Sequence, residues 1–341
     1  MNGSAGGETI AVIGAGSWGT ALAIQFARTG HPTLLWGRAD EDPSGMQQQR
    51  ENARYLPGAR FPDSLRAAGD LGKVLAEAPI VVVAVPSHAF REVLTQMKPR
   101  LRRDTRLAWA TKGFELATGK LPHQVAREVL GPDVAMAVLS GPTFAREVGM
   151  GLPTAMTVAA TDEKYARHLA EILSGDSFRA YTSTDIIGVE VGGAVKNVLA
   201  IGAGICDGLG FGSNTRVALI TRGLVEMTRL GIALGAQPAT FMGLAGIGDL
   251  VLTCTDDQSR NRRMGLALAS GKSVQEAEAE IQQVVEGVLA AEAVYRVARE
   301  AEVEMPICEQ IYRILYKGAE PQEAVLALMK RELKSEFASG G

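Results

Sequence analysis

A lysine stands where packing alone would favour an apolar residue. Lys196 lies in the stretch VGGAVKNVLAIGAG, and on a helix its neighbours three and four positions away are Gly192, Gly193, Leu199 and Ala200. Such a small, apolar face is ordinarily buried, and burial of an ammonium is costly unless the group is paired or its pKa shifts. We therefore predict that Lys196 donates and accepts a proton; the alternative is a stem that passes the glycines so that the ammonium reaches solvent.

Further polar residues follow predicted strands or glycine-rich turns. Lys112 follows a strand in WATKGFE, SGPTFA at 140–145 follows another strand with a Gly-Pro turn, and Asp249 lies in GLAGIGDLVLTC. Ligands of open α/β sheets bind beyond the carboxyl ends of the strands, where Lys112 and residues 141–145 should lie. Lysine and arginine side chains that converge there favour an anionic substrate.

The stretch QSRNRRMG brings Ser259, Arg260 and Asn261 to the start of a predicted helix. A hydroxyl, a guanidinium, an amide and free backbone donors at a helix start make a good phosphate cradle. Taken alone, Ser259 is a helix cap and Arg260 lies in water. Together with the two lysines, the group favours phosphate binding.

A glycine pattern opens the chain in IAVIGAGSWGTALA. Gly14 permits a tight turn, Gly16 lets the backbone approach a pyrophosphate, and Gly19 lets the following helix pack closely on the strand. The pattern alone is weak evidence, but a strand at 10–13, a helix at 17–28 and a second strand at 33–36 surround it in register. We predict a dinucleotide site whose phosphates meet the helix N-terminus.

The second strand ends in Leu-Leu-Trp-Gly-Arg, and Arg38 takes the place where an NAD-selective site usually carries an acid. A guanidinium there can pair with a 2′-phosphate, so NADPH is favoured. Asp40 and Glu41 follow closely enough to leave NADH possible. The alternative for Arg38 is a solvated residue at a strand end.

The elements that must position these residues change in kind along the chain. Strands are expected at 10–13, 33–36, 80–85, 107–111, 134–139, 154–159 and 179–182, with helices at 17–28, 89–97, 122–129 and 163–173. Strands that alternate with helices predict a Rossmann-type α/β domain, with a doubly wound and mostly parallel sheet.

Beyond residue 187 the expected elements are all helical, at 191–205, 215–234, 262–269, 273–279, 287–301, 307–316 and 321–328. The change of pattern predicts a boundary near 183–189. We expect a dinucleotide-binding domain at 8–187, an all-α substrate and dimerisation domain at 188–330, and a flexible tail at 331–341.

Composition limits the classes of function. The 341 residues carry a net charge of −3 without a sustained basic face, which argues against a nucleic-acid binder. The longest apolar stretch, 189–212, is interrupted by Glu190, Lys196, Asn197 and Asp207, so no membrane span is expected. Three widely separated cysteines without ligand spacing argue against a metal site and suit a reducing cytoplasm.

With these stretches assembled, the chain resembles bacterial NAD(P)-dependent glycerol-3-phosphate dehydrogenases. The motifs that carry the resemblance follow the family's order from residue 14 to about residue 287. They are GAGSWGTALA, LWGR, YLPG, VPSHAFR, TKGFE, SGPTFA, GGAVKNVLAIGAG, GLAGIGDLVLTCT, SRNRRMG and VVEG.

The resemblance implies roles for individual residues. The cofactor would be contacted by Ser17, Trp18 and Arg38, with Ala145, Val284 and Glu286 nearer its nicotinamide half. Lys112 would touch cofactor and substrate, Gly141 and Thr143 would help to hold the substrate, and Lys196 would be the acid/base. The substrate site would be completed by Asp249, Ser259, Arg260 and Asn261, with Arg260 also reaching the cofactor. The family also implies a homodimer and a product used in phospholipid synthesis.

The expected reaction is the reversible reduction of dihydroxyacetone phosphate to sn-glycerol 3-phosphate. The ketone takes a hydride on carbon from the nicotinamide and a proton on oxygen from Lys196. Asp249 orients either the lysine or a substrate hydroxyl, and the sequence does not decide between them. The competing interpretations are a ketopantoate reductase or β-hydroxyacid dehydrogenase of similar build, and a nucleotide-sensing module without catalysis.

Overall fold

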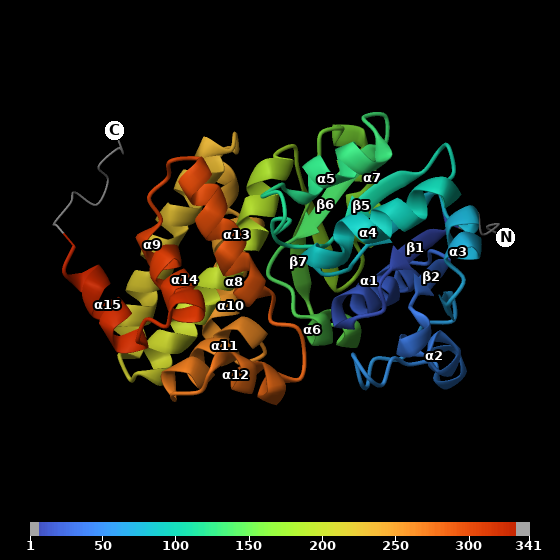
Figure 1. Ribbon diagram of the computed structural model, residues 1–341. Coiled ribbons are helices and arrows are strands. Elements are labelled where there is room, and N and C mark those ends of the chain that lie inside the picture. The colour runs from blue at the N-terminus through green and yellow to red at the C-terminus, as the bar shows by residue number, and fades with distance from the viewer. Residues whose placement is uncertain (1–6, 332–341) are drawn as a thin grey trace.

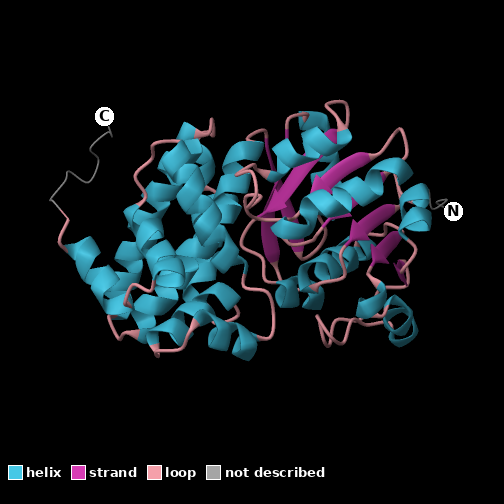
Figure 2. Ribbon diagram, viewed as in Figure 1, coloured by secondary structure: helices cyan, strands magenta, loops and turns pink. Residues whose placement is uncertain are grey.

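The computed structural model describes residues 7–331 and contains an α/β half followed by a helical half (Figures 1 and 2). One eight-stranded sheet runs in the order β3-β2-β1-β4-β5-β6-β7-β8. Its strands are β1 (Ile10–Ile13), β2 (Thr33–Trp36), β3 (Leu65–Ala68), β4 (Ile80–Val83), β5 (Arg106–Trp109), β6 (Ala135–Ser140), β7 (Thr154–Ala160) and β8 (Phe178–Ser183).

Six of the seven strand pairings are parallel, and β7 pairs with β6 in the antiparallel sense. The strands β1 and β4 are buried along their whole length because helices cover both faces of the sheet. Alternate residues therefore enter different cores. Ile10 and Val12 face one core, whereas Ala11 and Ile13 face the other.

The helices of this half divide between the two faces. One core contains side chains from α1 (Ser17–Arg28), α2 (Pro43–Gln49), α6 (Ala145–Met150) and α7 (Glu163–Leu173). The other contains side chains from α3 (Leu71–Glu77), α4 (Ser87–Met97) and α5 (Pro122–Leu130). The sheet is thus doubly wound, as predicted.

The helical half is built around α8 (Ile186–Gly208), which starts beside the sheet and runs among the other helices (Figure 1). It packs against α9 (Gly212–Ala233), α10 (Asp249–Thr255), α11 (Arg260–Ala269), α13 (Glu286–Glu300) and α14 (Pro306–Lys317). The remaining helices are α12 (Val274–Ile281) and α15 (Pro321–Met329). Because α8 is surrounded by other elements, 20 of its 23 residues are buried.

The expected fold class is confirmed, with local corrections. The strand β3 and the helices α2, α3, α6 and α10 were not predicted. Short elements of this kind carry too little hydrophobic periodicity to be recognised, and β3 is a four-residue edge strand that contains Arg66. The division at residues 187 and 188 stays a prediction, and α8 runs continuously across it. The tail predicted at 331–341 lies outside the described residues from 332 onward.

By length and composition, α8 could cross a membrane, but 94% of its most apolar window is buried inside the structure. Burial of this degree is what the core helix of a folded domain shows. The three cysteines are buried and unpaired.

Candidate functional site

Two lysines from different halves of the chain share one carboxylate. Lys196 Nζ donates to Asp249 Oδ1 at 2.7 Å, and Lys112 Nζ donates to Asp249 Oδ2 at 2.7 Å. Lys112 follows β5 at the carboxyl edge of the sheet, Lys196 lies in the middle of α8, and Asp249 opens α10. The structure therefore joins three residues that the sequence separates by up to 137 positions.

Burial strengthens the electrostatic interactions among the three charged groups of this cluster. Lys196 is 7% exposed and Asp249 is 1% exposed. Desolvation, together with repulsion from Lys112, lowers the pKa of Lys196 to about 8, although Asp249 favours its charged form. Burial opposes ionisation of Asp249, but the two ammonium groups outweigh it and lower its pKa. An ammonium with a pKa near neutrality can release and recover a proton readily.

Thr253 is a member of the cluster that sequence reasoning missed. Its Oγ1 accepts from Lys196 Nζ at 2.8 Å and donates to the backbone oxygen of Asp249 at 2.6 Å. The spacing could have identified Thr253, because residues four positions apart lie on the same face of a helix. This spacing is informative only within a helix, and the helix α10 was not predicted.

A pair of glycines on α8 lets the cluster form. A Cβ at Gly192 would lie 2.4 Å from the backbone oxygen of Ala245, in the turn before α10. A Cβ at Gly193 would lie 3.3 Å from Lys112 Cγ and 3.4 Å from Ser140 Oγ. Because glycine has no side chain, the turn before α10 can approach α8 at Gly192, and the Lys112 side chain can approach it at Gly193.

A second polar network adjoins Lys196 in sequence. Asn261 Nδ2 donates to Asn197 Oδ1 at 2.9 Å, and Asn261 Oδ1 accepts from the backbone N–H of Gly287 at 2.8 Å. Asn197 Nδ2 donates to Glu286 Oε2 at 3.4 Å. Asn197 was not among the predicted site residues, and this network makes it the link between Asn261 and Glu286.

The start of α11 has the form expected of an anion cradle. Ser259 caps the helix, accepting from the backbone N–H of Arg262 at 3.2 Å, so its own hydroxyl proton is free to donate. Ser259 is buried, whereas Arg260 is partly exposed and its guanidinium forms no hydrogen bond or ion pair with another side chain or backbone group of residues 7–331. The helix N-terminus and a free guanidinium suit a phosphate.

The glycine turn between β1 and α1 fits a dinucleotide. Gly14 has φ of +115°, and a Cβ there would lie 2.6 Å from the backbone oxygen of Ala84. A Cβ at Gly19 would lie 1.9 Å from the backbone oxygen of Gly14, so the helix packs directly on the turn. Open space surrounds the Cβ direction of Gly16, and no side chain of the described residues caps α1. Backbone donors thus remain available to a pyrophosphate.

Other predicted cofactor residues lie around this turn. Ser17 Oγ donates to the backbone oxygen of Tyr55 at 2.7 Å, and the buried indole N–H of Trp18 has no hydrogen-bond partner in the described chain. Arg38 follows β2 and pairs with Asp40 at 3.0 Å.

The remaining predicted site residues are Gly141, Thr143, Ala145 and Val284. None of them forms a hydrogen bond or ion pair with Lys112, Lys196 or Asp249. Gly141 follows β6 with φ of +154°, and Thr143 Oγ1 donates to its backbone oxygen at 3.2 Å. Ala145 begins α6, and Val284 is 47% exposed in the loop before α13. The individual roles of these residues stay predictions.

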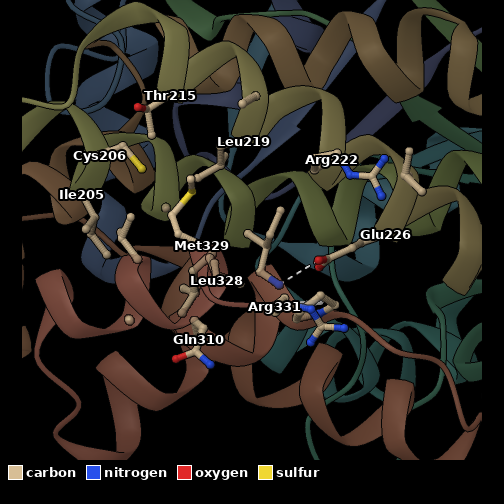
Figure 3. A pocket seen from close by; sticks show the side chains of 18 of the residues that line it. Ile205, Cys206, Thr215, Leu219, Arg222, Glu226, Gln310, Leu328, Met329 and Arg331 are labelled. Carbon is tan, nitrogen blue, oxygen red and sulfur yellow. Dashed lines mark hydrogen bonds between the residues drawn. The ribbon is translucent and has the colours of Figure 1, made fainter. Parts of the chain in front are cut away.

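A separate cavity of about 580 Å³ lies between α8, α9, α14 and α15 (Figure 3). Its lining is mostly apolar and includes Leu219, Ile311 and Met329, and it contains none of the predicted site residues. Among residues 7–331, no group of three or more His, Cys, Asp or Glu side chains could hold a metal ion.

A doubly wound sheet with a glycine-rich first turn, joined to helices that carry a buried lysine, is the build of dinucleotide-dependent oxidoreductases. The chain belongs to the NAD-dependent glycerol-3-phosphate dehydrogenase family. Residues 9–166 match the family's N-terminal part, and residues 185–326 match its C-terminal part.

Named relatives support this membership over nearly the whole chain. Glycerol-3-phosphate dehydrogenase (NAD(P)+) from Aeromonas hydrophila is 58% identical over 96% of this chain and 98% of its own, and that from Tolumonas auensis is 56% identical over the same shares. The crystal structure of glycerol-3-phosphate dehydrogenase from Coxiella burnetii is 48% identical, with a TM-score of 0.92 over 95% of this chain and 99% of the other.

The ketopantoate reductase from Ralstonia eutropha is similar in fold alone. It is 16% identical, with a TM-score of 0.59 over 93% of this chain and 99% of the other.

Proposed function

We propose that this protein catalyses the reversible reduction of dihydroxyacetone phosphate to sn-glycerol 3-phosphate with NAD(P)H. The observation that carries the proposal is the cluster of Lys112, Asp249 and Lys196 at the junction of the two halves. The names of relatives that are 56–58% identical support the substrate and the coenzyme class. The product would supply glycerophospholipid synthesis.

Lys196 is the proposed proton donor for the carbonyl oxygen. Its ammonium polarises the carbonyl before reaction and neutralises the charge that develops on oxygen, and a bound nicotinamide coenzyme supplies the hydride. Lys112 adds a second positive charge at the same place. In a buried site such charges act more strongly than in water.

Asp249 is the proposed orienting residue of Lys196. Its Oδ1 lies 2.7 Å from Lys196 Nζ, which supports orientation of the lysine over contact with a substrate hydroxyl. Its second oxygen binds Lys112, so one carboxylate fixes both ammonium groups. A fixed donor acts without the reorganisation that a mobile lysine would need.

The substrate phosphate is proposed to bind at the start of α11. Arg260, the Ser259 hydroxyl and backbone N–H groups supply donors, and Asn261 is held beside them by Asn197 and Gly287. Gly141 and Thr143 are proposed to complete the substrate site. Arg260 is also proposed to reach the coenzyme, together with Lys112, Ala145, Val284 and Glu286.

The coenzyme is proposed to be NADPH in preference to NADH. Arg38 stands at the end of β2, where an acid would favour the ribose hydroxyls of NAD. We further propose a cytoplasmic homodimer. Three buried, unpaired cysteines support a reducing compartment, and exposed apolar side chains on α9 and α15 support association through the helical half.

The proposed reaction is tested by following oxidation of NADPH and of NADH with three substrates, dihydroxyacetone phosphate, dihydroxyacetone and ketopantoate. Rapid oxidation with the phosphorylated ketone alone is the expected result, and a faster rate with NADPH at low coenzyme concentration would support the preference. Rapid oxidation with ketopantoate would refute the proposed reaction. So would the absence of oxidation with all three substrates, if the protein is folded and binds NADPH.

A further inference from the structure

The loop that precedes the YLPG stretch is fastened to the glycine turn. Asn52, 1% exposed, donates through Nδ2 to the backbone oxygen of Ala15 and to Thr20 Oγ1, each at 2.8 Å. The Ser17 hydroxyl donates to the backbone oxygen of Tyr55 at 2.7 Å. Arg54, between the two anchored residues, is therefore held at a defined place relative to the dinucleotide turn.

Arg54 and Arg38 both contact Asp40. Arg38 Nη2 lies 3.0 Å from Asp40 Oδ2, and Arg54 Nη1 donates to the backbone oxygen of Asp40 at 3.1 Å. The Arg54 guanidinium also lies 5.0 Å from the centroid of the Tyr55 ring. Two guanidiniums thus flank the end of β2, beside the place where dinucleotide folds bind the adenosine ribose.

The acidic groups around these guanidiniums differ in how firmly they are held. Glu41 accepts from the backbone N–H of Arg38 at 2.8 Å and also lies 4.0 Å from Arg38 Nε, and Asp42 caps α2 by accepting from the N–H of Gly45 at 3.0 Å. The Asp40 carboxylate has only Arg38 as a partner among the described residues, and both side chains are more than 60% exposed. An exposed pair of this kind is weak and is readily replaced by a phosphate dianion.

We propose that Arg54 is a second residue that selects NADPH. Arg38 and Arg54 bind the 2′-phosphate from two sides, and the Asp40 carboxylate leaves Arg38 when the phosphate arrives. This inference rests on the proposed coenzyme site at the glycine turn, and it adds Arg54 and Asp40 to that site.

The test measures binding to the ligand-free protein by calorimetry, with 2′,5′-ADP and 5′-AMP as probes. Arg54→Ala should weaken 2′,5′-ADP about tenfold or more, since a charge-assisted contact is lost, and should change 5′-AMP less than about twofold. Asp40→Asn should strengthen 2′,5′-ADP because the competing carboxylate is gone. The matched control is Arg60→Ala, an arginine of the same loop that pairs with Glu51 and should leave both affinities unchanged.

An Arg54→Ala protein that keeps the wild-type ratio of the two affinities would overturn the proposal, as would equal weakening of both probes. Weaker 2′,5′-ADP binding by Asp40→Asn would overturn the role given to Asp40. Neither probe contains a nicotinamide or requires a ketone, so a failure to reduce dihydroxyacetone phosphate would count against the proposed reaction and leave this result standing.

Discussion

At the scale of single residues, the central feature is an ammonium that is buried yet paired. Lys196 lies among small residues of α8, and its only acidic partner within hydrogen-bond distance, among the described residues, is an Asp249 carboxylate that Lys112 also contacts. Three charges with a net value of +1 lie in one poorly solvated place. A substrate anion would balance that charge.

Lys196→Ala tests the proposed acid/base role. Positioned proton transfer contributes roughly 10²- to 10⁴-fold to a rate, so turnover with dihydroxyacetone phosphate should fall by at least about 10²-fold. NADPH affinity, measured by fluorescence titration, should stay within about threefold because the nucleotide turn is untouched. Lys98→Ala, at an exposed lysine, serves as the control. Turnover near the wild-type value would remove Lys196 from the mechanism.

The lowered pKa of Lys196 gives a pH dependence with a definite sign. The proposed role of Lys196 as proton donor requires its protonated form, and burial lowers its pKa to about 8. Measured as kcat/KM for dihydroxyacetone phosphate, activity should be level at pH values more than about one unit below this pKa, fall to about half at the pKa, and then decrease toward tenfold per pH unit above it. The residual activity of Lys196→Ala should lack this fall. A wild-type profile that stays level up to pH 10 would contradict the assignment.

At the scale of elements, glycines decide how closely the helices approach α8. Gly192 faces the backbone of Ala245, and Gly204 and Gly265 let α8 and α11 touch, since a Cβ on either would lie 2.0 Å from a backbone oxygen of the other helix. Backbone atoms cannot move aside as side chains do. The separation between Lys196 on α8 and Asp249 on α10 therefore depends on residues that have no chemistry of their own.

Gly192→Ala should lower stability and activity together. The new methyl group would lie 2.4 Å from the Ala245 oxygen, and overpacking of this kind costs about 1–3 kcal/mol. Urea unfolding and kcat measure the two effects. Gly72→Ala is the matched control, because this helical glycine on α3 has its nearest atom at 3.4 Å and should be neutral or slightly stabilising. Equal stability of the two variants would show that α8 and the 244–248 turn can separate without cost.

At the scale of the whole molecule, α8 connects the sheet to the helices. Near its start, Glu190 accepts from Trp109 Nε1 at 3.0 Å and from the backbone N–H of His123 at 2.9 Å. Burial of Glu190 raises its pKa, although His123 opposes the shift. The same helix borders the cavity beside α9 and α15 at its other end (Figure 3). One continuous helix thus connects sheet, lysine cluster and outer helical surface.

Association through that outer surface is tested by Val217→Glu. Val217 is 59% exposed on α9, one of the helices that border the cavity, and a charge there should shift the protein from dimer to monomer in size-exclusion chromatography with light scattering. Tyr181→Glu, at a half-exposed residue on β8, should leave the mass unchanged. A monomeric wild type would refute the homodimer, and a dimer in both variants would place its interface elsewhere.

The sequence by itself determined most of the local secondary structure and which side chains are candidates for the functional site. The helices α1 and α7 have the predicted bounds because their apolar residues recur at helical spacing, and β1 and β4 were evident as short runs apolar on both faces. Lys196, Lys112 and Asp249 were singled out because polar residues in glycine-rich or apolar surroundings need partners.

Only the tertiary structure decided which partners those are. Asp249 binds both lysines because α10 lies beside α8 and the carboxyl edge of the sheet, an arrangement that no spacing along the chain encodes. The strand β3 forms because β2 offers it an edge, and Thr253 joins the cluster because a short, unpredicted helix turns it inward. Local periodicity depends on residues a few positions apart, whereas a shared carboxylate depends on the packing of whole elements, and that packing places one oxygen of Asp249 within 2.7 Å of each ammonium.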